Sequence, residues 1–177
     1  MNTTELNRFT SMYQHQVAQT IKMLEPVTES QYSEIPIDNE VMFMGSRVNK
    51  INITTLVKHL IVAESHWFVE LSEVNEGDTI PIPKNAEIVK DVNEPETLLH
   101  LLGKTSKLGI ETVRTFDETQ LNTRFNFVGQ QFTVMGFLWM LYSHHGYHKG
   151  QIDQLMRQMG HMPIEYLEYE TTSNLIG

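Results

Sequence analysis

Apolar residues recur at every third or fourth position in four long stretches of this chain, and that spacing restricts what it can fold into. The period matches the 3.6 residues of a helical turn, so each stretch predicts an amphipathic helix with one face towards a core. The stretches cover approximately residues 4–25, 52–74, 93–116 and 133–160. Polar and apolar side chains alternate in residues 124–132, which predicts a short hairpin before the last helix. We therefore predict an all-α protein, a four-helix bundle.

Residues at the ends of these stretches support the predicted boundaries. Pro26 stops the first helix, since a proline ring disfavours helical geometry in the residue before it. Asn93 is predicted to cap the third helix, with a proline in the first turn, and Gly160 to end the fourth. The inward line of the third helix is predicted to be Leu98, Leu101, Thr105, Leu108, Thr112 and Phe116.

The composition narrows the class of protein. A chain of 177 residues with one continuous set of helical patterns predicts a single domain, residues 1–177. Its formal net charge of -9 disfavours nucleic acid and anionic lipid as partners. The first residues lack the pattern of a signal peptide, and the most apolar window, residues 134–142, is too short to span a membrane, so a cytoplasmic location is expected. With no cysteine, the strong metal ligands available are His, Asp and Glu.

Two histidines of the last predicted helix, His144 and His148, stand four residues apart. This spacing places both imidazoles on one helix face about a turn apart, where they can bind one metal ion. They fall on the apolar line of Phe137, Leu141, Leu155 and Met159, so both are predicted to point inward. A buried imidazole without a partner costs about 1–3 kcal/mol. A shared cation would satisfy both rings, and so would core carbonyl groups or water.

A third candidate ligand, His59, interrupts the inward line of the second predicted helix, formed by Leu56, Leu60, Ala63 and Trp67. A lone histidine on an apolar face is more often a satisfied core residue, but three on two helices favour a shared metal ion. His66 lies two turns further on, at the rim of a pocket or half-exposed on the surface.

Three neighbours of the pair are candidates for supporting roles. Gln151 follows His148 by three residues and could hydrogen-bond a ligand imidazole, or it is an amide at the bundle edge. Lys149 could meet an anionic substrate at the mouth of the pocket, or it is a solvated lysine. His145 is predicted to face the flank of the helix and is not counted as a ligand.

The residue pattern excludes two common metal motifs. The residue after His144 is a histidine, so the His-Glu-x-x-His motif of zinc peptidases is absent, and no Glu is followed three residues later by His, as a di-iron bundle requires. A mononuclear site with three imidazoles resembles catalytic zinc sites that leave one position open. Zinc, nickel, iron(II) and copper suit imidazole ligands, and the spacing does not choose among them.

These residues together resemble the DinB/YfiT-like metalloprotein family. Its members carry a His on the second helix with a Trp some eight positions later, and the motif His-x-x-x-His-Arg-Gly-Gln on the fourth. Here the matching residues are His59 with Trp67, and His144-x-x-x-His148-Lys149-Gly150-Gln151. Lys149 replaces the usual arginine, and His145 stands where many members have an acidic residue. The resemblance implies a bundle with a long crossover between helices.

The resemblance also implies a function. Characterised relatives include S-transferases and isomerases that use thiols such as bacillithiol or mycothiol. We therefore predict that His59, His144 and His148 hold one divalent ion, which activates a thiol or water against a small molecule, with S-transfer first and hydrolysis second. The alternative is a non-enzymatic bundle with a structural metal ion and a role in self-association or partner binding, because no general base is obvious beside the histidines. A homodimer is expected from the relatives.

Overall fold

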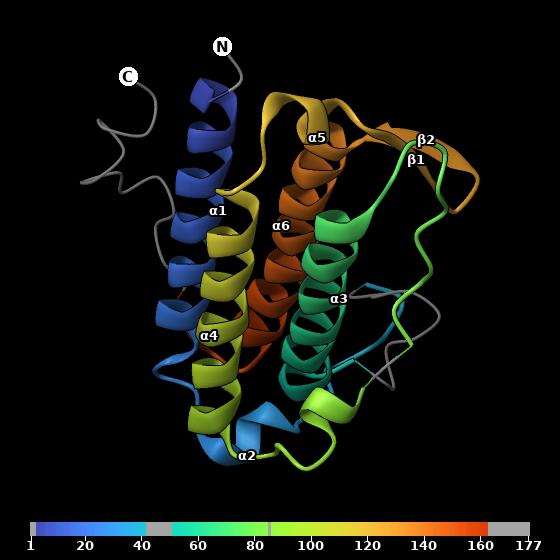
Figure 1. Cartoon of the computed structure of the whole chain (residues 1–177). Helices are drawn as coiled ribbons and strands as arrows, with labels where there is room; N and C mark the ends of the chain where they lie inside the picture. The colour runs from blue at the N-terminus through green and yellow to red at the C-terminus, as the bar shows by residue number, and fades with distance from the viewer. Residues whose placement is uncertain (1–2, 42–50, 85, 163–177) are drawn as a thin grey trace.

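Four long helices form the body of the molecule in the computed structural model (Figure 1). The structure describes residues 3–41, 51–84 and 86–162, so both ends of the predicted domain 1–177 lie outside the described part. The predicted four-helix bundle is confirmed, and its helices are α1 (Thr3–Leu24), α3 (Ile53–Glu73), α4 (Pro95–Val113) and α6 (Val134–Gln158). Three short elements were not predicted, namely α2 (Glu29–Tyr32), the 3-10 helix η2 (Glu87–Val89) and α5 (Glu118–Asn122).

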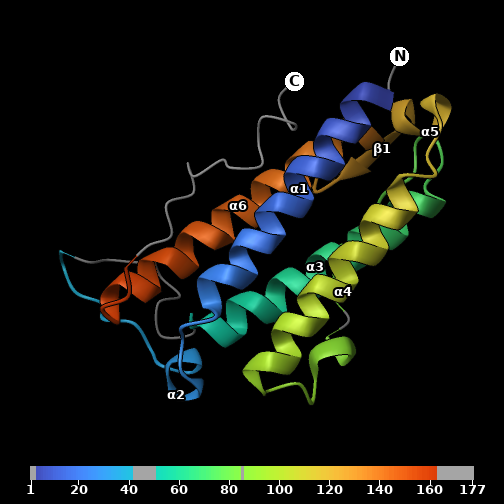
Figure 2. The same cartoon turned by 90° about the vertical axis from the view of Figure 1, so that its left-hand side faces the viewer.

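The order in which the helices pack determines the connections between them. Helix α1 packs against α4 and α6, and α3 packs against the same two helices from the other side (Figures 1 and 2). Helices α3 and α4 run in the same direction, opposite to α1 and α6 (Figure 1). Two parallel neighbours cannot be joined by a tight turn, so the chain between α3 and α4 returns along the whole length of the bundle. This return is the long crossover that the resemblance implied. None of the described helices has an apolar stretch long enough to cross a membrane.

The helix ends follow the local sequence, with one correction. Asn52 caps α3 by accepting a hydrogen bond from the Thr55 amide at 2.9 Å, and Thr133 caps α6 through the Gly136 amide at 3.0 Å. Asn93 was predicted to cap α4, but Glu94 holds that position and makes no capping bond with its side chain. The Asn93 side chain instead accepts a hydrogen bond from Lys58 Nζ at 2.9 Å, so it ties the start of α4 to α3.

The predicted hairpin is confirmed as strands β1 (Arg124–Phe127) and β2 (Gln130–Thr133). Both residues of its turn have positive φ, 49° at Val128 and 76° at Gly129, as a two-residue hairpin turn requires. The hairpin also holds the start of the crossover, because Asn126 donates its amide to the Asp78 carbonyl and accepts from the Ile80 amide.

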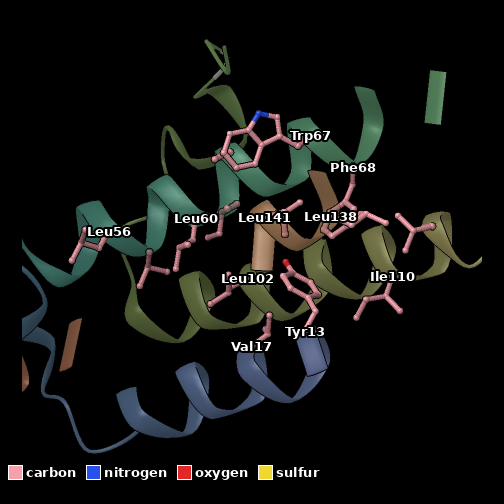
Figure 3. Packing of buried hydrophobic residues seen from close by; sticks show 14 of the residues in the cluster. Tyr13, Val17, Leu56, Leu60, Trp67, Phe68, Leu102, Ile110, Leu138 and Leu141 are labelled. Carbon is pink, nitrogen blue, oxygen red and sulfur yellow. The ribbon is translucent and has the colours of Figure 1, made fainter. Parts of the chain in front are cut away.

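The core lies between all four helices (Figure 3). The predicted inward line of α4 is wrong by about one residue, since Leu108 is 53% exposed. A glycine explains the shift: a Cβ at Gly109 would lie 2.1 Å from Cδ2 of Phe68, so the phenyl ring of α3 packs directly on the α4 backbone. The buried face of α4 is therefore Leu98, Leu102, Ser106, Gly109, Ile110 and Val113.

Candidate metal centre

Helices α3 and α6, which pack side by side, bring the three candidate ligands together. His144 and His148 stack one turn apart on α6, with ring centroids separated by 4.5 Å. His59 of α3 faces both, and its ring centroid lies 5.1 Å from His144 and 4.6 Å from His148. The sequence predicted that these three residues meet, and the structure places them in one cluster.

The donor atoms of the cluster fit a single metal ion. One ring nitrogen from each histidine lies within 4.8 Å of the other two, and His59 Nε2 is 3.0 Å from His144 Nε2. Two nitrogens bound to one tetrahedral zinc ion lie roughly 3.4 Å apart, so this separation is close to that of a shared ion. No other group of three His, Asp or Glu side chains with such convergence occurs within residues 3–41, 51–84 and 86–162.

The burial of the three ligands differs from the prediction. His59 is exposed, and His144 and His148 are half-buried, although all three were predicted to point inward. The line through Leu56, Leu60, Ala63 and Trp67 is buried as predicted, but His59 lies beside it. The cluster therefore sits at the edge of the core, where α3 and α6 meet solvent, and a molecule from outside can reach it.

Gln151 directs the ring of His148. The His148 Nδ1 atom lies 2.7 Å from Gln151 Oε1, and an amide oxygen can only accept, so Nδ1 carries the hydrogen and Nε2 keeps its lone pair. Burial lowers the pKa of His148 to about 4, helped by repulsion from His144 and His59 and opposed by the Gln151 hydrogen bond. The neutral ring that a metal ligand needs is thus favoured in this position.

The histidine that the core encloses is His145, which was predicted to face the flank of α6. Its side chain is fully buried, and its Nδ1 lies 2.9 Å from Oε1 of Glu64 on α3. Glu64 is itself only 2% exposed, and the sequence analysis assigned it no role. The signal was present in the spacing, since Glu64 lies four residues after Leu60 and His145 four after Leu141, on the inward lines of their helices.

Hydrogen bonds connect His145 to two other helices. Its Nε2 lies 2.9 Å from the hydroxyl oxygen of Thr20 on α1, and that hydroxyl also contacts the Gln16 carbonyl at 3.0 Å. The other ring nitrogen, Nδ1, faces the Glu64 carboxylate and donates to it, because a carboxylate can only accept. His145 and Glu64 therefore form a buried hydrogen-bonded pair across α3 and α6.

Glu64 is held as a carboxylate by its neighbours. Burial alone would raise its pKa, but the electrostatic interaction with His145, the nearby His144 ring and hydrogen bonds from His145 and Tyr13 outweigh that effect and lower the pKa to about 2. Tyr13 donates its hydroxyl to Glu64 Oε2 at 2.6 Å, and burial together with the Glu64 charge raises the pKa of this phenol. Figure 3 shows the Tyr13 hydroxyl reaching from α1 into the core.

The remaining two candidates lie away from the cluster. Lys149 was a candidate either for the mouth of the pocket or for a solvated position, and in the structure its Nζ donates to Gln19 of α1 at 2.7 Å. It lines a cavity of about 320 Å³ between α1 and α6, whose walls include none of the three ligands. His66 contacts the crossover, with Nε2 3.2 Å from the Pro81 carbonyl oxygen, and its Nδ1 lies 3.8 Å from Glu70.

Comparisons with known proteins agree with this architecture. The model of a family described as the DinB superfamily matches residues 12–152. Among solved structures, YfiT from Bacillus subtilis is similar, with 18% identity, a TM-score of 0.69 and coverage of 89% of each chain. That structure is described as "a probable metal-dependent hydrolase with an unusual four-helix bundle topology". At this level of identity the likeness establishes the fold alone. No curated protein matched the sequence.

Proposed function

This chain belongs to the DinB superfamily, and we propose that it holds one divalent metal ion at His59, His144 and His148 and hydrolyses a small molecule there. The proposal rests on one observation, the convergence of three imidazoles from α3 and α6 with ring nitrogens within 4.8 Å of one another. Zinc, nickel and iron(II) remain the candidate metals, because imidazole suits all three.

The donor set favours a catalytic site over a structural one. Structural zinc sites in proteins usually have four protein ligands, whereas catalytic sites have three and leave a position for water or substrate. Within the described residues, no carboxylate joins the three histidines as a fourth ligand. His59 is exposed, so a substrate can approach from the solvent side. When bound, a divalent ion supplies Lewis-acid chemistry, since it lowers the pKa of a water that it binds and polarises an electrophile.

The protein's own residues prepare the site for that ion. Gln151 keeps the Nδ1 hydrogen on His148, so the Nε2 lone pair faces the cluster. The ring of Trp67 meets His144 edge to face at a centroid distance of 4.9 Å, which limits rotation of that imidazole. Preorganisation of this kind reduces the ordering that binding requires.

Hydrolysis now comes before thiol transfer in our ranking. The structurally similar YfiT is described as "a probable metal-dependent hydrolase", whereas no feature of the described residues or of the comparisons points to a thiol. Transfer to a low-molecular-weight thiol and the homodimer stay predictions from the resemblance, and the cytoplasmic location stays a prediction from the residue pattern.

The test compares metal-free and metal-loaded protein, prepared without a metal-affinity tag. Bound metal is measured by elemental analysis. Turnover is measured with chromogenic carboxylic esters and phosphate esters as substrates. We expect near-stoichiometric zinc, nickel or iron and at least tenfold faster hydrolysis of one substrate class after loading. His148→Ala should abolish both, while His100→Ala, an exposed histidine on α4, should change neither.

Two other outcomes would count against hydrolysis. Bound metal without turnover of any ester would favour the non-enzymatic bundle with a structural ion. Turnover only when a low-molecular-weight thiol and a chromogenic electrophile are supplied would restore S-transfer to first place.

A further inference from the structure

One ring nitrogen of His144 lacks the partner that its burial requires. His144 Nε2 faces His59 at 3.0 Å, but Nδ1, on the other edge of the ring, is buried without a hydrogen-bond partner. A buried unpaired donor costs about 1–3 kcal/mol. The acceptor that faces this nitrogen is Glu64 Oε1, at 3.9 Å, which is about 1 Å longer than a charge-assisted hydrogen bond.

Glu64 is fixed from two sides and still has acceptor capacity. Tyr13 donates to Oε2 at 2.6 Å, and His145 donates to Oε1 at 2.9 Å. A carboxylate offers about four acceptor positions, so Oε1 can accept a second hydrogen bond from His144. These two contacts come from α1 and α6, so the carboxylate on α3 can move little.

We propose that Glu64 is a positioning residue of the metal centre, whose Oε1 accepts a hydrogen bond from His144 Nδ1 and thereby presents His144 Nε2 to the ion. This inference rests on the proposed metal site. Metal-binding histidines commonly donate their second ring nitrogen to a carboxylate, which sets the tautomer and raises the basicity of the ligand. Glu64 is not a ligand itself, because it lies behind the His144 ring, opposite the edge that faces His59.

The two roles of Glu64, holding helices together and orienting His144, make different predictions. A carboxylate that only joins helices would change the stability of the fold when replaced, but not the metal affinity of protein that remains folded. A positioning carboxylate changes the metal affinity and the environment of His144 Nδ1.

The first experiment measures the zinc dissociation constant of folded protein by chelator competition. Glu64→Gln keeps the size of the side chain and removes its charge, and we expect zinc binding about 10–100-fold weaker. Tyr13→Phe removes one hydrogen bond that holds Glu64, and we expect a severalfold loss. Thr10→Val is the control, because Thr10 is buried on α1 and its hydroxyl donates to the Asn7 carbonyl of the same helix, and it should leave the constant unchanged within twofold. A folded Glu64→Gln protein with wild-type affinity would overturn the inference.

The second experiment needs no variant to fold. Histidine ring ¹H–¹⁵N NMR spectra of wild-type protein with zinc should show His144 bound through Nε2, with a hydrogen-bonded proton on Nδ1. Coordination through Nδ1 would overturn the inference. If zinc binds as described but no ester is hydrolysed, the proposed hydrolysis fails and the role of Glu64 stands. If wild-type protein binds neither zinc, nickel nor iron, both proposals fail together.

Discussion

The two edges of the His144 ring lie in opposite environments. One edge faces the exposed His59 and the half-buried His148, whose ring nitrogens converge with that of His144 at the surface of the bundle. The other faces Glu64, which together with its hydrogen-bond partner His145 is buried and bonded to α1 through Tyr13 and Thr20. We call these the open side and the enclosed side. We infer from this contrast that the candidate metal ligands contribute little to the stability of the fold. The buried residues behind them stabilise it.

The largest expected effect is on the enclosed side. His145→Ala removes one of the donors to the buried Glu64 carboxylate and leaves a space in the core, so the free energy of unfolding should fall by about 3–5 kcal/mol. Urea unfolding of metal-free protein measures this loss, with His100→Ala as the exposed control. A loss below about 0.5 kcal/mol, within the range of ordinary surface changes, would contradict the buried Glu64–His145 pair.

The open side should show the reverse pattern. His59→Ala alters an exposed side chain, so the stability of metal-free protein should change by about 0.5 kcal/mol or less. Zinc at a hundred times its dissociation constant should stabilise wild-type protein by about 2.7 kcal/mol, and the variant should lose this gain. Thermal unfolding with and without zinc tests both points. A metal-free variant already as unstable as His145→Ala would remove the distinction between the two sides.

The open side and the enclosed side should change the stability of the fold in different pH ranges. The pKa of His148 is lowered from 6.5 to about 4, so the unfolded chain takes up this proton first and stability falls as the pH drops from 6.5 to 4. The pKa of Glu64 is lowered from 4.5 to about 2, so its contribution is complete above 4.5 and is lost as the pH falls towards 2. Metal-free His148→Ala should lose the first dependence, and Glu64→Gln the second. Identical pH profiles for the two variants in chelator would show that one group dominates both windows.

The smallest effects should concern the two polar neighbours on α6. Gln151→Ala removes the acceptor for His148 Nδ1, and zinc binding should weaken about tenfold. Lys149→Met leaves the zinc dissociation constant within twofold, because Lys149 contacts Gln19 of α1. A loss of zinc affinity in Lys149→Met as large as that in Gln151→Ala would place the lysine at the open side after all.

Sequence periodicity was sufficient for the four long helices and the hairpin, because both depend on local spacing and on local stop signals. It singled out the three candidate ligands for the same reason, since two of them lie one turn apart. It failed for α4, where Gly109 admits the ring of Phe68 and turns the helix by about one residue. That contact depends on two helices at once, and spacing within either one does not reveal it.

The enclosed side was missed for a related reason. Glu64 and His145 both stand on inward lines, but a charged residue in such a line can be explained as a helix flank until its partner is known. Their pairing across α3 and α6, with Tyr13 from α1, exists only after the bundle has formed. The open side is local enough to be inferred from the chain, and the enclosed side is a product of tertiary structure.

The parallel arrangement of α3 and α4 has a consequence for the order in which the protein folds. Contacts between these helices cannot form progressively from a short connecting turn. The crossover must first return along the bundle, and Asn126 of the hairpin holds its start. Contacts across such a return carry a larger loop-closure entropy than those of a helical hairpin, and they slow folding. We expect this bundle to fold more slowly than an up-and-down bundle of similar size.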